Sequence, residues 1–171
     1  PDSIYTKPRP GLWTAAQRAG MAKRINYVTI QETFTNIKGN PVPKGDSWQR
    51  IMDQLTEWKD GDKTYGKLES WTPRDILVID SFSRYCDSRM YLELVLNGRA
   101  TQGRQLADYF KVQTAIEQTL ELLVSKMVRC HVLLMCHIEY IEGDDKINRG
   151  FPQGMGKALG PKIGQHFNHA I

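Results

Sequence analysis

The sequence predicts an α/β fold, and three observations support that prediction. Residues 76–79 form an aliphatic run with the length and β-branched content of a strand buried on both faces. Residues 131–138 form a second, mostly apolar run; Asp80 directly follows the first run, and His137 lies next to the end of the second. Between them, residues 107–128 carry apolar side chains at helical spacing. Strand, long helix and strand in that order predict a βαβ unit with parallel strands.

The N-terminal part is predicted to be irregular first and then to enter the sheet. Residues 1–24 contain three prolines within the first eleven positions, and helical character follows over residues 12–23. Residues 25–30 alternate apolar with polar or small side chains, which predicts a strand. Residues 34–46 hold two glycines and two prolines, which predicts a loop.

The middle of the chain alternates helix and strand. Ser47 is placed to cap a helix whose apolar residues recur at i, i+3 and i+4 up to about Lys59. A loop over residues 62–73 then leads into the strand at 76–79. After it we expect a short helix at 91–96, and a Gly-rich, basic loop region over residues 143–164.

Length and composition limit the classes of protein that fit. A chain of 171 residues with 40% hydrophobic and 25% charged side chains suits a single domain with its own core. No apolar run approaches the roughly 18 residues needed to cross a bilayer, and no signal-peptide pattern opens the sequence. The three cysteines lack CxxC spacing, which favours reduced thiols and a cytoplasmic protein.

Charge is distributed unevenly although the net charge is only +4. Four acidic residues lie between positions 139 and 145, and residues 146–171 then hold four Lys or Arg and no Asp or Glu. A basic, Gly-rich tail fits a phosphate or nucleic-acid surface. Such a run is also found as ordinary solvated surface, and charge alone does not separate the two interpretations.

Asp80 is the first candidate site residue. It ends the strand at 76–79 and Ser81 follows at once. A carboxylate at the C-terminal edge of a buried strand is costly to desolvate without a cation or donors, and that edge is where open α/β sheets bind ligands. Asp80 therefore fits a Walker B acid that holds Mg²⁺ through water beside nucleotide phosphates. The alternative is an Asp that caps the next turn.

His137 ends the second predicted strand, so parallel pairing would bring it to the same edge as Asp80. The pair suits Mg²⁺ and a γ-phosphate sensor, while an acid/base pair of a hydrolase and a purely structural histidine are the alternatives. Zinc does not fit Cys136 and His137, because neighbouring residues on a strand point to opposite faces and no second ligand pair has metal spacing. No GxSxG, HExxH, Rossmann or Walker A pattern is present.

The ordered set of motifs resembles the RecA-fold P-loop ATPases, and among them the phage-encoded AAA- or Sak-type recombination proteins. The set consists of the run ending Asp80-Ser81, a long helix, a strand ending at His137, and the Gly-rich stretch 154–160. Gly45-Asp-Ser-Trp48 and Leu68-Glu-Ser-Trp71 match as well, and the resemblance covers residues 27–171. It implies a three-layer RecA-like core with a mostly parallel sheet, ATP and Mg²⁺ as cofactors, single-stranded DNA as partner, and a ring or filament of copies.

The resemblance also implies roles for particular residues. Asp80 would organise Mg²⁺ with Ser81 as its hydroxyl neighbour, and His137 would be the polar sensor. Lys157 and Lys162 would approach the phosphates or a neighbouring subunit's nucleotide. The DNA-facing loops would lie near residues 90–102 and 142–156, with nucleic-acid contacts from Arg99, Arg104, Lys146 and Arg149. A phage-encoded member would act in the host bacterial cytoplasm.

One feature departs from the family. Members of the family carry a Walker A loop upstream of the strand that corresponds to residues 25–30 here. The 24 residues before Ile25 contain no such loop. Without its backbone N–H groups and lysine, the β- and γ-phosphates lack a binding site. We therefore expect a RecA-like domain truncated at its N-terminus, either part of an ATPase acting on single-stranded DNA in recombination or replication, or an interaction module that has lost nucleotide binding.

Overall fold

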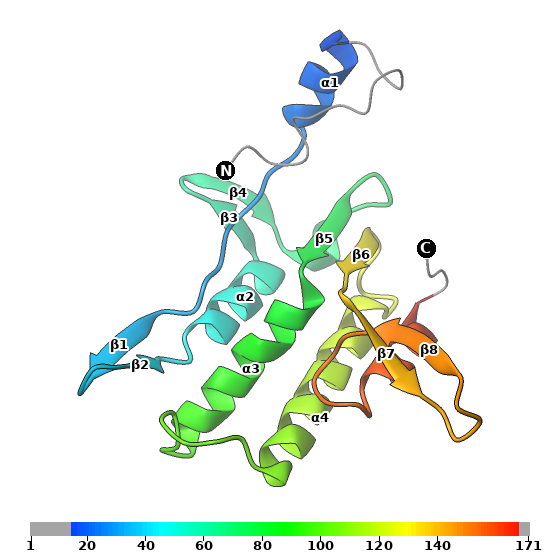
Figure 1. Cartoon of the computed structure of the whole chain (residues 1–171). Coiled ribbons are helices and arrows are strands. Elements are labelled where there is room, and N and C mark those ends of the chain that lie inside the picture. Colours follow the sequence, from blue (N-terminus) through cyan, green and yellow to red (C-terminus); the bar gives the residue numbers. More distant parts are fainter. Residues whose placement is uncertain (1–14, 168–171) are drawn as a thin grey trace.

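The computed structural model describes residues 15–167 and shows a mixed α/β fold. Three helices, α2 (Ser47–Thr56), α3 (Phe82–Leu96) and α4 (Leu106–Leu123), lie side by side, and short strands gather around them (Figure 1). This confirms the predicted α/β class. The strands form four separate two-stranded sheets, so the single large sheet of a three-layer core is not present among the described residues.

The predicted parallel pair is present. Strand β5 (Ile76–Asp80) pairs in parallel with β6 (His131–Met135), and the register sets Ile76 opposite His131 and Asp80 opposite Met135. Helices α3 and α4 form the connection between the two strands. The remaining pairs are antiparallel, because a short turn can join antiparallel neighbours whereas a parallel pair needs a long crossover.

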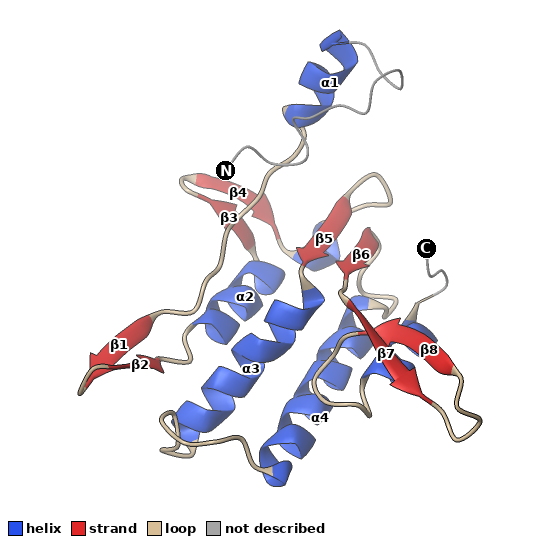
Figure 2. Cartoon of the chain, viewed as in Figure 1, coloured by secondary structure: helices blue, strands red, loops and turns tan. Residues whose placement is uncertain are grey.

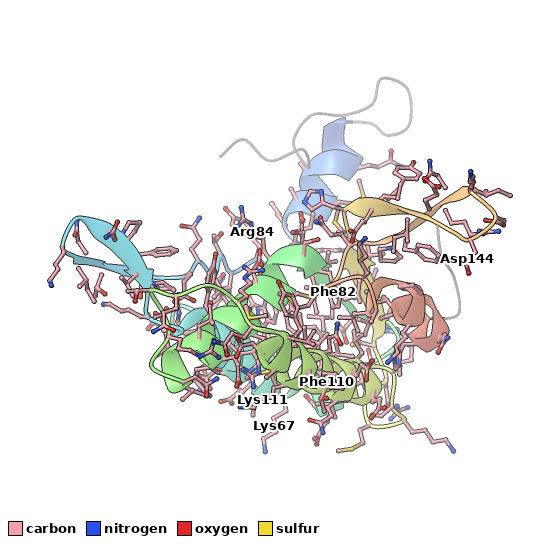
Figure 3. The ribbon with its side chains drawn as sticks, turned by 60° about the horizontal axis from the view of Figure 1, so that its bottom comes forward. Lys67, Phe82, Arg84, Phe110, Lys111 and Asp144 are labelled. Carbon is pink, nitrogen blue, oxygen red and sulfur yellow. The ribbon has the colours of Figure 1, made fainter. Side chains whose placement is uncertain are left out.

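The core forms where α3 and α4 pack beneath that strand pair. Side chains one turn apart on α3 meet side chains one turn apart on α4, as helical periodicity predicts. Figure 3 shows Phe82 within this packed interior and Phe110 at the outer surface of α4. The residues with no exposed surface on the two helices are Phe82, Cys86, Met90, Val112, Ile116 and Leu120.

Three antiparallel hairpins extend from the helical body (Figure 2). They are β1 (Phe34–Ile37) with β2 (Asn40–Pro43), β3 (Trp58–Asp60) with β4 (Lys63–Gly66), and β7 (Ile138–Glu142) with β8 (Asn148–Pro152). All three lie wholly or partly where the sequence predicts loops. The first turns on Lys38 and Gly39, both with positive φ, which is a backbone shape that glycine adopts without steric cost.

The smaller elements complete the chain. Helix α1 (Ala15–Ala22) projects away from the body (Figure 1). It covers most of the helix predicted over residues 12–23. Lys23 lies in a turn, and residues 12–14 lie outside the described residues. The 3₁₀ helix η1 (Leu68–Ser70) precedes β5, and α5 (Gly160–Ile163) and η2 (Gly164–His166) close the described chain.

Other boundaries differ from the sequence-based expectations. The strand predicted at residues 25–30 is wrong, because this segment has no regular secondary structure. The helix expected at 91–96 begins earlier, at Phe82, and the strand expected at 131–138 ends at Met135, after which β7 starts a new direction. Over residues 15–167, every helix is too short or too polar to pass through a bilayer.

Candidate functional site

The ends of β5 and β6 form a rim that carries both predicted strand-end residues. Asp80 is opposite Met135 in the parallel register, and His137 follows two residues later, so both lie at the same end of the strand pair. Both side chains are exposed. Within residues 15–167, neither the Asp80 carboxylate nor the His137 imidazole is engaged by a hydrogen bond or an ion pair. The rim therefore presents an acid and an imidazole that are free to meet a ligand.

Two hydrogen bonds hold the segments around the rim together. The Ser83 hydroxyl, in the first turn of α3, donates a hydrogen bond to the carbonyl oxygen of Gln153 at 3.1 Å. The Gln153 amide donates in turn to the His137 carbonyl oxygen at 2.7 Å. The first turn of α3, the link between β6 and β7, and the end of β8 are thus tied to one another. This network positions His137 relative to the segment that follows Asp80.

Ser81 connects the strand to α3. It is the residue that precedes the helix, its backbone is extended, and its side chain makes no capping hydrogen bond. The Asp80–Ser81 peptide bond is cis. The first amide groups of α3 have no partner within the helix, so the rim also offers backbone donors and the positive end of a helix dipole beside the Asp80 carboxylate.

A cleft of about 550 Å³ opens beside the free edge of β5. The extended segment 28–34, α2 and α3 form its other walls. Asp80 and Ser81 line it, whereas His137 does not. The structure thus brings Asp80 and His137 to one rim but places only Asp80 and Ser81 at the cleft. Its polar lining includes Gln31, Glu32, Ser47, Gln54, Asp80, Ser81, Arg84, Asp87 and Ser88.

Glu32 is a cleft residue that sequence reasoning missed. Its carboxylate accepts hydrogen bonds from the backbone amides of Gly45 and Ser47 and from the Ser47 hydroxyl. A carboxylate at a helix N-terminus satisfies amides that lack a helical partner, so Glu32 fixes the start of α2. No local sequence signal marks Glu32, because the contact with Ser47 joins residues 15 positions apart.

Arg99, a predicted nucleic-acid contact, lies in an ion pair with Asp108. Both guanidinium nitrogens of the fork bond to the two carboxylate oxygens, and Asp108 is buried at the start of α4. The Gln105 amide donates to the same carboxylate at 2.8 Å. The hydrogen bond from Arg99 holds the pKa of the Asp108 carboxyl below its usual value. A phosphate that bound Arg99 would have to compete with this pair.

Other predicted basic contacts are also paired with carboxylates. Arg104 reaches Asp87 at 3.2 Å, and Lys162 reaches Glu117 on α4 at 2.8 Å. Arg149 forms two hydrogen bonds with Asp145, at 2.9 and 2.6 Å. Lys146 and Lys157 are exposed, and neither makes an ion pair with any residue that the structure describes. Of the six predicted basic residues, these two lysines keep their charge available.

A second buried acid, Glu93, joins α3 to α4. Its carboxylate accepts a hydrogen bond from Arg89 of α3 at 3.1 Å and one from Asn97, which follows α3, at 2.9 Å, and it pairs with Lys111 of α4 at 3.0 Å. Burial raises the pKa of Glu93, but the hydrogen bonds from Lys111, Asn97 and Arg89 outweigh it and the net pKa is lowered. Arg89 and Asn97 lie four residues before and after Glu93, whereas Lys111 meets it only when the helices pack, and sequence reasoning missed this network.

The described residues offer one carboxylate for a metal at the rim. Over residues 15–167, no three His, Cys, Asp or Glu side chains lie close enough together to hold a metal ion by themselves. Mg²⁺ commonly takes one or two carboxylates and completes its octahedron with water and substrate phosphates. Asp80, exposed and without a protein partner in the described part of the chain, fits that requirement.

The cysteines take no part in this rim. Cys86 and Cys130 are buried and Cys136 is partly buried, and all three are free thiols. Burial raises the pKa of each thiol above its usual value. The thiols are therefore protonated near neutral pH and are poor nucleophiles.

Comparison with known proteins adds no assignment to this geometry: no family model, no curated protein and no solved structure matches the chain.

Proposed function

We propose that this chain is part of a RecA-like ATPase that acts on single-stranded DNA in phage-type recombination or replication. The observation that carries the proposal is the parallel pairing of β5 with β6, in the register that sets Asp80 opposite Met135. That register brings a strand-end acid and a strand-end histidine to one edge, where α/β folds bind nucleotides. This parallel pairing is the one expected from the βαβ pattern on which the resemblance rests.

In this proposal each rim residue has one task. Asp80 would hold a hydrated Mg²⁺, and Ser81 and the first amides of α3 would bind the same hydrated ion or a phosphate oxygen. His137 would act as a hydrogen-bond donor toward the terminal phosphate. When bound, Mg²⁺ would supply positive charge that offsets the charge of the phosphate oxygens. The chain's own contribution is positioning, which the Ser83–Gln153–His137 bonds support.

The proposal also needs a phosphate cradle. The 171 residues contain no GxxxxGK[ST] pattern, and we propose that a further chain segment or a partner supplies the backbone N–H groups and the lysine. The strand pair leaves room for such a segment. Ile76, Val78 and Leu133 are exposed on it, although parallel strands are normally covered on both faces. We propose that an added strand beside β6 and an added helix on this face complete a three-layer core.

DNA contact is the second part of the proposal. Lys146 and Lys157 are the predicted basic residues whose charges are available, and each neutralised phosphate releases counterions. Binding of single-stranded oligonucleotides should therefore weaken as salt increases. Affinity that does not change with salt would remove the phosphate contacts from the proposal.

Substitution of Asp80 tests the nucleotide site. In the intact protein, Asp80→Ala should lower ATP turnover about 100-fold or more, because it removes the only carboxylate proposed to organise Mg²⁺. Asp62→Ala is the matched control, since Asp62 is exposed in the turn between β3 and β4. Far-ultraviolet circular dichroism should show that both variants keep the fold. Undiminished turnover in Asp80→Ala would exclude this residue from the mechanism.

The second candidate is an interaction module with a RecA-like shell and no nucleotide. The exposed apolar face at Ile76, Val78 and Leu133 favours it, because such a face suits a protein partner as well as a further segment of chain. One simple binding measurement distinguishes the two functions. Fluorescent ATP analogues should bind the intact protein in the presence of Mg²⁺ if it is an ATPase, and should not bind if it is a module.

A further inference from the structure

Two hairpins with opposite charge lie at opposite ends of the molecule. We name residues 138–152, which contain β7 and β8, the acidic hairpin, and residues 34–44, which contain β1 and β2, the basic hairpin. Figures 1 and 2 show them extending from opposite sides of the helical body, and the turned view of Figure 3 shows the same separation. Neither hairpin contributes a side chain to the strand-end rim formed by Asp80 and His137.

The acidic hairpin opposes the charge of the rest of the chain. It contains four acidic residues and two basic ones, so its net charge is −2, while the whole chain carries +4 and the remainder therefore carries +6. Arg149 is already bonded through both nitrogens to Asp145. Asp144 lies at the outer end of the hairpin in Figure 3 and, within residues 15–167, makes no ion pair. Apart from Lys146, whose free charge is proposed above to meet a DNA phosphate, the net negative charge of this hairpin favours a basic surface as partner.

The acidic hairpin also exposes apolar side chains. Ile138 is 66% exposed and Tyr140 is 69% exposed, and they lie on the same face of β7. Both pack against Gly150 of β8, where an added Cβ would lie 3.1 Å from Ile138 Cγ2 and 3.4 Å from Tyr140 Cε1. Ile147, at 55% exposed, adds to the apolar surface near the turn. An aromatic and two aliphatic side chains beside carboxylates are the composition of a protein-docking surface.

The basic hairpin has the complementary composition. It contains Lys38 and Lys44 and no acidic residue. Phe34 is 51% exposed and Ile37 is 49% exposed. The Phe34 ring meets Tyr91 of α3 edge to face, with centroids 6.2 Å apart, which holds one side of the ring against the body. The hairpin therefore offers apolar surface flanked by positive charge.

We propose that the acidic hairpin of one copy of this chain docks on the basic hairpin of the next copy. Like charges oppose contact between two acidic hairpins or between two basic ones, so a two-fold symmetric dimer through either hairpin is disfavoured. A head-to-tail contact joins different surfaces, and it extends into an open chain or closes into a ring. The contact uses no residue of the rim and does not depend on nucleotide, so its failure leaves the proposed function untouched.

Two hairpins bury less area than a standard protein interface of about 1,600 Å², so the association is weak and depends on concentration and salt. Sedimentation velocity of the whole chain from about 1 to 100 µM should show the weight-average sedimentation coefficient rising with concentration. The rise should be smaller in high salt. A chain that stays monomeric over this range overturns the proposal.

Charge reversal tests which surfaces meet. The acidic-hairpin variant carries Glu142→Lys with Asp144→Lys, and the basic-hairpin variant carries Lys38→Glu with Lys44→Glu. Each variant alone should associate at least about tenfold more weakly than the natural chain, because like charges then face each other. An equal mixture should recover association, since every contact between unlike copies pairs opposite charges again. A mixture that does not recover contradicts the proposed pairing.

Two further variants distinguish this contact from a net-charge effect and from nucleic-acid binding. Lys67→Glu with Lys126→Glu changes the net charge as the basic-hairpin variant does, but on exposed residues outside both hairpins. It should leave association within about twofold of the natural chain, and a larger loss would mean that net charge alone is responsible. Tyr140→Ser should weaken self-association and leave oligonucleotide binding unchanged. If Tyr140→Ser instead weakened oligonucleotide binding and left self-association unchanged, Tyr140 would face nucleic acid and not a second copy, and the proposal would be overturned.

Discussion

The strand-end rim and the basic loops were predicted to carry function for different reasons. In the structure the rim side chains are free, whereas most of the basic side chains in the loops are paired with carboxylates. Asp80 and His137 lie at adjacent strand ends with no protein partner among residues 15–167. Arg99 and Arg149, by contrast, each bond through two nitrogens to a carboxylate. Position at the end of an aliphatic strand predicted an available side chain, whereas positive charge in a loop did not. The prediction that this strand is buried on both faces was wrong, because Ile76 and Val78 are exposed on one face.

The difference follows from how each prediction depends on long-range structure. A strand end is exposed whenever the strand pairs in the expected register, and that register follows from local pattern and the βαβ rule. The availability of an arginine depends on every acid that folding brings within reach. Asp108 lies nine residues from Arg99, beyond the three- and four-residue spacings at which helical neighbours meet. Substitutions in the two regions should therefore differ in how much they lower the stability of the fold or the binding of DNA.

The largest effect is expected at Phe82, which anchors the rim from below. Phe82 is fully buried at the start of α3, so Phe82→Ala should lower the free energy of unfolding by about 4 kcal/mol through lost burial and a cavity. Urea unfolding measures the change. Phe110→Ala is the matched control on the surface of α4 and should cost less than about 1 kcal/mol. Equal losses for the two would mean that the packing of α3 does not hold the rim.

A smaller effect is expected when the buried pair in the basic region is broken. Asp108→Asn leaves Arg99 without its charged partner in a mostly buried place, and should lower the melting temperature by about 5–10 °C. Differential scanning calorimetry measures it. Asp145→Asn breaks an exposed pair with Arg149 and should change the melting temperature by about 2 °C or less. A similar drop in both variants would contradict the distinction between a structural and a surface pair.

Acid should weaken the same buried network. The pKa values of Asp108 and Glu93 are both lowered in the folded chain. Carboxyls with lowered pKa values contribute stability above their unfolded values of about 3.9 and 4.3, and lose it as pH falls through the folded values. The urea midpoint should therefore fall as the pH decreases below about 4.3. In the Asp108→Asn variant the urea midpoint should fall less steeply with decreasing pH. An unchanged slope of midpoint against pH would mean that Asp108 does not contribute to the acid sensitivity.

The smallest effect concerns DNA contact. If Lys146 meets a phosphate, Lys146→Ala should reduce the slope of log affinity against log salt by about 1 for single-stranded oligonucleotides. Arg149→Ala should change that slope less, because its charge is already neutralised by Asp145. Fluorescence anisotropy at several salt concentrations separates the two. A larger change for Arg149→Ala would show that DNA displaces Asp145 from this arginine.

Sequence reasoning located the parallel core better than its surroundings. The strands at 76–80 and 131–135 and the helix at 106–123 match the expected segments, because long periodic or aliphatic runs have few other ways to be buried. The hairpins were missed because their strands are only three to five residues long and carry prolines or charges. Over residues 25–30 the alternation predicted a strand that the described structure does not pair with any neighbour.

The amino-acid sequence by itself determined the order of strand, helix and strand, and the residues at the strand ends. These follow from side-chain periodicity and from the cost of burying a carboxylate, and both are local properties. Tertiary structure alone decided which basic side chains keep a free charge, where Glu32 binds the start of α2, and that opposite charges lie at opposite ends. Apart from the local pair of Arg149 with Asp145, those outcomes depend on contacts between residues distant in sequence, such as Arg104 with Asp87 and Lys162 with Glu117, which only the folded chain brings together.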